Sequence, residues 1–309
     1  MKEYYLGIDM GSVSTNLVLM KSDKTIAHKV YVRSKGRPVD SLKDGMDMLQ
    51  KEAGEFKVLG AGVTGSGRKL IGSLTGADVI KNEITAHAVA AAAEVPMVRT
   101  IIEIGGQDSK LIWLQEGIVQ DFAMNTVCAA GTGSFLDRQA GRLGIAIDEL
   151  GPLAQKSNNP VRIAGRCAVF AESDMIHKQQ EGCPLADILR GLCEALARNF
   201  LSNLAKGRTL REPILFQGGV AANPAMVAAF QRELQAEVRV PRYFDVMGAW
   251  GAAIVALEER QQKGGVSNFS MDFMQRSVET VGFECSDCSN HCWIIRSGTA
   301  FWGSRCGKY

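Results

Sequence analysis

The chain has 309 residues, enough for one large or two moderate domains with a substantial buried core. Its 46% hydrophobic and 22% charged residues are typical of soluble globular proteins, and a net charge of +2 gives no reason to expect a nucleic-acid partner. A strand pattern begins where a signal peptide would lie, and no apolar run reaches the roughly 18 residues that span a bilayer. We therefore expect a cytoplasmic protein without a membrane partner, in which the eight cysteines are reduced thiols or metal ligands rather than disulfides.

The first third of the chain predicts a three-stranded meander that is followed by a helix and another strand. Apolar runs at 3–9, 16–22 and 25–32 are separated by the glycine turn at 10–12 and by a charged turn. A helical pattern at 41–56 then leads to an apolar run that ends in glycines at 57–65.

The same order of elements recurs about a hundred residues later. Strand patterns occupy 99–106, 110–115 and 118–125, with a turn at Gln107-Asp108-Ser109, and a further strand follows at 212–219. This repeat indicates a duplicated α/β fold, although chance similarity between two meanders is an alternative. The expected boundaries are a first half at 1–98, a second half at 99–258 to which the cysteine-bearing helices belong, a linker at 259–282 and a tail at 283–309. The chain could return to the first half near the end of the second.

Glycine turns end three of the predicted strands and are candidate phosphate-binding loops. In a duplicated fold, the first hairpins of the two halves would face a common cleft. Neighbouring acidic and amide side chains could hold Mg²⁺ through water or orient an attacking water. A third glycine turn opens a helix and could lie along a nucleotide. Short turns favour glycine and aspartate in any case, which is the structural alternative. The candidates are Asp9, Gly11, Ser12, Gly105, Gly106, Gln107, Asp108, Gly218 and Gly219.

Two cysteines each precede a sequence with helical periodicity: Cys128 in the stretch 125–138 and Cys167 in the stretch 165–178. The amino end of a helix favours negative charge and lowers the pKa of a thiol. A cubane iron–sulfur cluster needs four cysteines, and two chains related by a twofold axis would supply them. The alternative is that both cysteines are buried structural residues. Gly131 and Gly133, between the first cysteine and its helix, are further candidates for cofactor binding.

The sequence resembles the activators of 2-hydroxyacyl-CoA dehydratases and benzoyl-CoA reductases, the BadF/BadG/BcrA/BcrD type of the actin/Hsp70/sugar-kinase-like ATPases. The resemblance covers about residues 3–258, and its most specific elements are the two cysteine stretches. The matching motifs are GIDMGS at 7–12, TGSGR at 64–68, IGGQDSK at 104–110, NTVCAAGTGSFLD at 125–137, GRCAVFAESD at 165–174 and GGVAANP at 218–224.

This resemblance implies that Cys128 and Cys167 of two subunits hold one [4Fe–4S] cluster in a homodimer. It implies ATP and ADP as ligands with Mg²⁺, phosphate contacts at the first two glycine turns, and adenosine contacts at Gly218 and Gly219. ATP hydrolysis would drive a low-potential electron from a ferredoxin or flavodoxin to a partner iron–sulfur dehydratase or reductase in anaerobic metabolism.

Two positions depart from the pattern of this family. The family usually has a lysine shortly after the first glycine–serine turn, where this chain reads Ser14-Thr15-Asn16. It usually has aspartate before the second glycine pair, where this chain has Glu103. A missing lysine removes a positive charge near the phosphates, which bears on the hydrolysis rate more than on nucleotide binding.

The tail contains a second group of cysteines: Cys285, Cys288, Cys292 and Cys306. Four cysteines at this density suit Zn²⁺ or a second iron–sulfur cluster, with His291 as an alternative ligand. Unligated thiols are the alternative interpretation. Two other functions fit the same scaffold: a small-molecule kinase, and a nucleotide-binding sensor without turnover whose tail binds zinc.

Overall fold

The computed structural model describes residues 1–125, 131–165, 167–275, 279–297, 300–304 and 306. Backbone contacts divide the chain into two compact units. Unit 1 comprises Met1–Ala86 and Gly248–Tyr309, and unit 2 comprises His87–Met247. None of the helices in the described part is long and apolar enough to cross a membrane.

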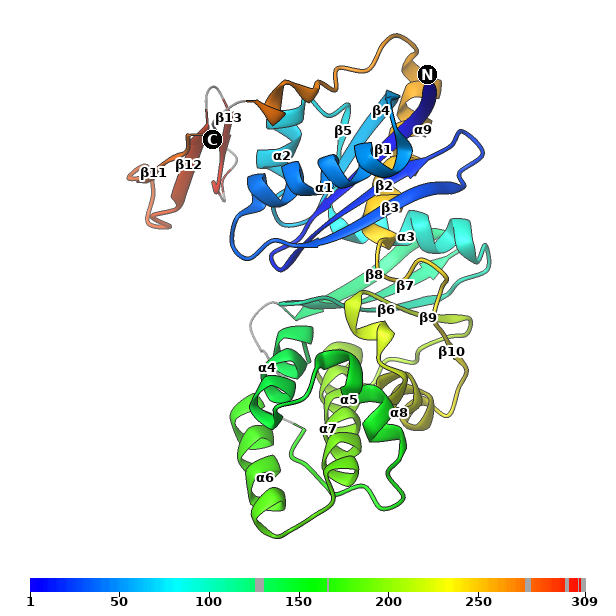
Figure 1. Ribbon diagram of the computed structural model, residues 1–309, viewed down its shortest axis with the longest axis vertical. Coiled ribbons are helices and arrows are strands. Elements are labelled where there is room, and N and C mark those ends of the chain that lie inside the picture. Colours follow the sequence, from blue (N-terminus) through cyan, green and yellow to red (C-terminus); the bar gives the residue numbers. More distant parts are fainter. Residues whose placement is uncertain (126–130, 166, 276–278, 298–299, 305, 307–309) are drawn as a thin grey trace. The chain divides into compact units, whose positions relative to one another are not determined.

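The sheet of unit 1 has five strands in the order β3-β2-β1-β4-β5 (Figure 1). Its antiparallel meander consists of β1 (Lys2–Met10), β2 (Ser14–Met20) and β3 (Ile26–Arg33). On the other side of β1, β4 (Phe56–Thr64) pairs in parallel, and β5 (Val79–Ile80) pairs in parallel with β4.

The sheet of unit 2 has the same topology, in the order β10-β9-β6-β7-β8. The meander consists of β6 (Thr100–Ile104), β7 (Ser109–Gln115) and β8 (Ile118–Asn125). The parallel strands are β9 (Ile214–Gln217), which pairs with β6, and β10 (Val238–Arg239). The predicted duplication of an α/β domain is therefore confirmed.

The helices of unit 1 are amphipathic or rich in small residues, according to what they cover. Helix α1 (Pro38–Ala53) begins with a proline in its first turn and buries Leu42, Met46 and Leu49, which recur at helical spacing. Helix α2 (Arg68–Thr75) ends at Gly76, whose left-handed φ of 65° closes the last turn. The chain passes between the units within α3 (Glu83–Glu94) and at the first residue of α9 (Met247–Lys263).

Helix α9 lies flush against β1 and β4 because glycines in those strands leave room for its backbone. A Cβ added at Gly7 or Gly62 would collide with the carbonyl oxygen of Ala249 or Ala252, respectively. This close approach fixes the helix on the sheet that carries the first glycine turn.

The described residues between β8 and β9 of unit 2 form the helices α4 (Gly133–Leu143), α5 (Ile147–Gln155), α6 (Ala168–Gln180) and α7 (Leu185–Phe200). A short π-helix, Leu201–Ala205, continues α7, and α8 (Pro224–Leu234) follows the 3₁₀ turn Gly219–Ala222 after β9.

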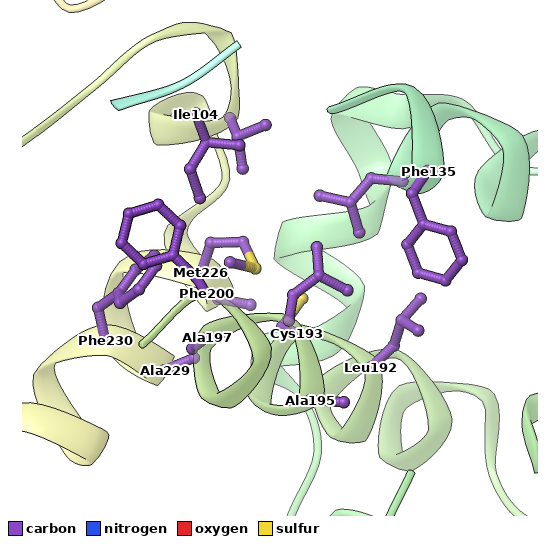
Figure 2. Close-up of a cluster of buried hydrophobic side chains, with 14 of the residues drawn as sticks. Ile104, Phe135, Leu192, Cys193, Ala195, Ala197, Phe200, Met226, Ala229 and Phe230 are labelled. Atoms are coloured by element: carbon purple, nitrogen blue, oxygen red, sulfur yellow. The ribbon is translucent and has the colours of Figure 1, made fainter. Parts of the chain in front are cut away.

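Helix α7 is the centre of the hydrophobic core of unit 2. Leu192 and Cys193 are fully buried on it, and Phe200 packs edge to face with Phe230 of α8 (Figure 2). Burial raises the pKa of the Cys193 thiol to about 12, so this cysteine is a packing residue and not a reactive one.

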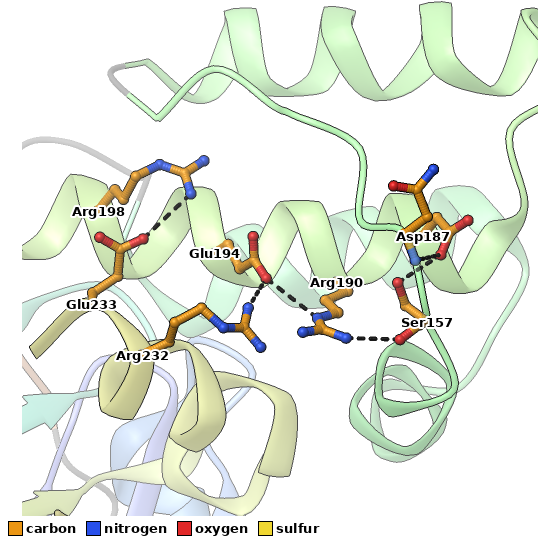
Figure 3. A network of polar contacts seen from close by, with 8 residues as sticks. Ser157, Asp187, Arg190, Glu194, Arg198, Arg232 and Glu233 are labelled. Carbon is orange, nitrogen blue, oxygen red and sulfur yellow. Dashed lines mark hydrogen bonds and ion pairs between the residues drawn. The ribbon is translucent and has the colours of Figure 1, made fainter. Parts of the chain in front are cut away.

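A polar network on α7 joins it to the neighbouring segments (Figure 3). Arg190 donates to the carbonyl oxygen of Ser157 at 2.7 Å and pairs with Glu194, which also pairs with Arg232 of α8. The Ser157 hydroxyl donates to Asp187 at 2.6 Å. These contacts join α7 to α8 and to the loop that follows α5.

Residues after α9 belong to unit 1 and end in a small sheet of their own. The 3₁₀ turn Met271–Met274 places Phe273, which is fully buried, in the core of unit 1. The strands β11 (Val281–Glu284), β12 (Trp293–Ser297) and β13 (Ala300–Trp302) then form an antiparallel sheet in that order. The expected domain boundaries stay predictions.

Candidate functional site

The first glycine turn connects β1 and β2 in unit 1. The backbone N–H of Gly11 donates to the carbonyl oxygen of Ser14 at 2.9 Å, which closes the turn. Ser12 at its tip is exposed, and Asp9 is half-buried at the end of β1. The sequence-predicted residues of this half are thus together at one end of the sheet.

Gly65 covers this turn from the end of the neighbouring parallel strand, β4. It has a φ of 93°, and a Cβ there would collide with the carbonyl oxygen of Met10 and lie 2.6 Å from an Asp9 carboxylate oxygen. The backbone N–H of Gly67 donates to the same Met10 carbonyl at 2.9 Å. Only glycine combines this backbone conformation with so close an approach.

The second glycine turn connects β6 and β7 in unit 2 and has the same construction. The backbone N–H of Gly105 donates to the carbonyl oxygen of Asp108 at 3.1 Å. Gly105, Gly106 and Asp108 are half-buried, whereas Gln107 is exposed at the tip. These four predicted site residues therefore lie in one loop.

A buried ion pair lies directly behind the second turn. The Lys110 ammonium donates to Glu103 at 2.9 Å and to Asp108 at 2.8 Å, and only 2% of the lysine side chain is exposed. Burial raises the pKa of the Glu103 carboxyl above its ordinary value, and the nearby Asp108 charge acts in the same direction, while Lys110 opposes both. Lys110 thereby fixes the carboxylate of Asp108 relative to the loop.

Gly218 takes the place in unit 2 that Gly65 takes in unit 1. It follows the parallel strand β9 with a φ of 89°, and a Cβ there would lie 2.5 Å from the carbonyl oxygen of Ile104 and 2.7 Å from Glu103. Gly219 is exposed beside it at the start of the 3₁₀ turn. In each half, a glycine with positive φ packs against the acidic residue near the end of the first strand, Asp9 or Glu103, and against the residue that follows it.

The second turn is hydrogen-bonded directly to the start of α4. The backbone N–H groups of Gly133 and Ser134 donate to the carbonyl oxygens of Gly105 and Gly106, both at 2.8 Å. Gly131, just before the helix, is buried, and a Cβ added there would lie 3.4 Å from Oδ1 of Asn199. A displacement of the turn is therefore transmitted to α4 through main-chain atoms.

Of the two predicted cluster cysteines, Cys128 lies outside the described residues. Cys167 is half-buried at the N-cap of α6, next to the strongly exposed side chains of Val169 and Phe170, which are 68% and 65% accessible. Asn199 donates to the carbonyl oxygen of Gly165 and so holds the loop that precedes Cys167. A thiol at a helix start, partly open to solvent and beside apolar side chains, suits a ligand to an anionic cluster.

Helices α4 and α6 are joined through Glu172 of α6. Its carboxylate accepts from Arg142 at 2.6 Å and from Gln139 at 3.2 Å, both on α4. Between the two helices lies a cavity of about 370 Å³, which is lined by Ser134, Phe135, Arg138, Ala168, Val169, Glu172, Ser173 and Ile176.

The profile of the BadF/BadG/BcrA/BcrD ATPase family matches residues 6–256. The chain belongs to this family.

Two relatives in the BadF/BadG/BcrA/BcrD ATPase family are activators of acyl-CoA dehydratases. The 2-hydroxyisocaproyl-CoA dehydratase activator of Clostridioides difficile is 34% identical over 84% of this chain and 97% of its own length. The (R)-2-hydroxyglutaryl-CoA dehydratase activating ATPase of Acidaminococcus fermentans is 33% identical over 84% of this chain and 99% of its own length.

A solved structure of the family has the same fold. The activator of the 2-hydroxyisocaproyl-CoA dehydratase from Clostridium difficile, with bound ADPNP, has a TM-score of 0.79 at 34% identity, covering 86% of this chain and 99% of that one. The predicted actin/Hsp70/sugar-kinase-like fold is thus confirmed.

The tail lies beyond the part that matches the family profile. Cys285 and Cys292 are buried there, whereas Cys288 and Cys306 are exposed. Within the described residues, no three His, Cys, Asp or Glu side chains are close enough to hold one metal ion. The predicted second metal site remains a prediction.

Sequence reasoning missed three features of this family member. Lys110 was not predicted to be buried with Glu103, because a lysine in a strand normally reaches solvent. Gly65 lies in the TGSGR motif at 64–68, but nothing in that motif identifies it as the counterpart of Gly218. Glu172 gave no signal, since its partners lie about thirty residues away in the sequence.

Proposed function

We propose that this protein is an ATP-hydrolysing iron–sulfur electron donor that activates a partner iron–sulfur dehydratase or reductase acting on an acyl-CoA. Two of its relatives are activators of acyl-CoA dehydratases, and the structure of one such activator was solved with ADPNP. The observation that carries the proposal is the position of Cys167, a half-buried thiol at a helix start beside exposed apolar side chains.

In this proposal the two glycine turns bind the phosphates of ATP and ADP through backbone N–H groups, and the third turn contacts the adenosine. The carboxylates of Asp9, at the end of β1, and Asp108, in the second turn, would hold Mg²⁺ through water. The exposed amide of Gln107 would orient the attacking water. The residues are Gly11, Ser12, Gly105 and Gly106 for phosphate, Gly131 and Gly133 beside them, Gly218 and Gly219 for adenosine, and Asp9, Asp108 and Gln107 for metal and water.

Cys128 and Cys167 from each of two chains would hold one [4Fe–4S] cluster in a homodimer. Such a cluster supplies one-electron chemistry at low potential. The exposed Val169 and Phe170 next to Cys167 are apolar surface of the kind that a second copy covers. A ferredoxin or flavodoxin would supply the electron.

Nucleotide binding would act on the cysteines through α4 and α6. Hydrogen bonds join Gly105 and Gly106 to the first N–H groups of α4, and Glu172 joins α4 to the helix that begins after Cys167. If ATP and ADP favour different positions of the turn, the start of α4 moves with it.

The test is iron content and ATP hydrolysis after anaerobic purification. We expect about two iron atoms per chain in the wild type, because two chains share four. Cys167→Ser and Cys128→Ser should lose this iron and its visible absorbance while their ATP hydrolysis continues. Cys183→Ser, which removes a half-buried thiol after α6, is the matched control and should keep the iron.

Full iron content in Cys167→Ser would refute the ligand assignment. Iron loss in Cys183→Ser as well would mean that iron responds to general destabilisation. An iron-loaded wild type whose reduced spectrum is the same with ATP and with ADP would contradict the coupling between nucleotide and cluster.

A further inference from the structure

Two cysteines of the tail are neighbours across its small sheet. The pairing of β11 with β12 ends at Glu284 opposite Trp293, and the next backbone N–H, that of Cys285, donates to the carbonyl oxygen of Cys292 at 2.8 Å. Opposed residues of an antiparallel ladder point to the same face, with Cβ atoms about 4.5–5.5 Å apart. Both cysteines are buried in one cluster with Ile294 and Phe283.

The other two cysteines lie near the same end of the sheet. Cys288 is in the short loop between Cys285 and Cys292. Strand β13 runs antiparallel to β12, and Gly303 after it is packed against the backbone of Trp293, so the chain reaches the cysteine end of the sheet before Cys306. The Cys306 thiol is 3.3 Å from the Ser304 hydroxyl.

The hydrophobic core that the described residues give this sheet is small. Its described cluster comprises Cys285, Cys292 and Ile294, with Phe283 packed against them. Sheets of this size usually depend on a disulfide, a metal ion or a neighbouring surface for stability.

We propose that Cys285, Cys288, Cys292 and Cys306 bind one Zn²⁺ ion that closes this end of the tail sheet. Sulfurs bound to one tetrahedral zinc at about 2.3 Å lie about 3.8 Å apart, which opposed ladder residues can achieve. In a cubane cluster each thiolate binds a different iron, so the cysteine sulfurs lie farther apart than on one zinc. Two cysteines that are paired across a β-ladder fit that wider spacing less well.

Zinc binding requires a local movement of the exposed thiols. Within the described part of the chain, no three candidate ligands are within reach of one ion. Cys288 and Cys306 are exposed in loops, so rotating them inward disturbs little packing. The exposed side chain of His291 lies 2.9 Å from Glu284, so we assign the four ligand positions to the cysteines.

This inference is independent of the proposed electron transfer, because the two sets of cysteines are different. The experiment uses the full chain, loaded with Zn²⁺ alone or with Co²⁺ alone as a spectroscopic probe. We expect about one zinc per chain beyond any iron, and thiolate-to-cobalt absorption with the intense visible bands of tetrahedral coordination.

Cys288→Ser and Cys306→Ser replace exposed residues and should keep the fold, which circular dichroism will check. Each of these variants should reduce the amount of bound zinc at least tenfold, whereas the control Cys183→Ser should keep its zinc. Unchanged zinc in both tail variants would overturn the proposal. So would loss of iron instead of zinc, or a thiol count that reveals a Cys285–Cys292 disulfide in the zinc-loaded protein.

Discussion

The two halves of this protein differ in charge at one pair of corresponding ladder positions. In unit 1, Asp9 at the end of β1 is opposite Asn16 on β2, whereas in unit 2 Glu103 at the end of β6 is opposite Lys110 on β7. Lys110 forms a buried ion pair with its acid, but the buried Asn16 Oδ1 has no hydrogen-bond partner among the described residues. The same fold position therefore supports a charged pair in one half and a neutral amide in the other.

This difference shows what the duplicated topology determines and what it leaves to individual residues. The strand order, the glycine turn and the covering glycine with positive φ are the same in both halves. The charge behind the turn is not the same. We expect the second half to lose stability when Lys110 is replaced. We expect the first half to bind ATP more tightly when a lysine is added.

The largest effect should come from Lys110→Met. It leaves Glu103 and Asp108 without their cation in a buried position, and we expect a loss of about 3–5 kcal/mol in the free energy of unfolding, measured by urea denaturation. Lys57→Met breaks an exposed pair with Glu3 and should lose less than about 1 kcal/mol. The double variant Glu103→Gln/Lys110→Met should recover much of the loss. A loss for Lys110→Met no larger than that for Lys57→Met would contradict the ion pair.

The same variant should change the dependence of stability on pH. Burial raises the pKa of Glu103 in the folded protein, so above the ordinary value of 4.5 the folded state holds this proton more tightly than the unfolded state. Stability is therefore lost as the pH rises from about 4.5 towards the raised pKa of Glu103. Without Lys110 the pKa rises further, and the deficit of Lys110→Met should be smaller at about pH 5 than at about pH 8. A deficit independent of pH would mean that Glu103 is not the affected group.

The covering glycines should be equally intolerant in the two halves. Gly65→Ala and Gly218→Ala place a Cβ against backbone oxygens at positive φ, and each should lose about 1–3 kcal/mol of stability. Gly54→Ala, at a φ of 74° and a ψ of −156° with open space around it, tests the conformational part alone and should lose about 1 kcal/mol. Equal losses at all three sites would show that the close contacts contribute nothing.

The smallest effect should come from making the first half resemble the second. Asn16→Lys adds a positive charge behind the Gly11–Ser12 turn, and under the proposed function the KM for ATP should fall by up to about tenfold. Asn16→Met removes the unpartnered amide oxygen without adding charge and should leave the KM unchanged. Steady-state hydrolysis measures both, and an equal response of the two variants would exclude a charge effect.

Much of this architecture could be predicted from the sequence because its signals are local. The apolar runs and glycine turns of both halves predicted the meanders, and the two cysteine stretches led to the family. The contact of Gly218 with Glu103 could not be predicted, because it joins residues more than a hundred positions apart. The burial of Lys110 depends on which acids its strand meets, and Asn199 reaches the loops at Gly131 and Gly165 only after α7 is packed.

The hydrogen-bonded connection between the second turn and the start of α4 runs through main-chain amides and carbonyls. Replacing side chains along the helix would leave it intact, and only positions where an added carbon would obstruct it should be sensitive. Gly133 is such a position, because a Cβ there would lie 3.0 Å from the Gly105 oxygen. A deep mutational scan of this segment should therefore find Gly133 intolerant even of alanine, alongside the buried core residues Phe135 and Leu136, and this intolerance is a signature of communication through the peptide backbone.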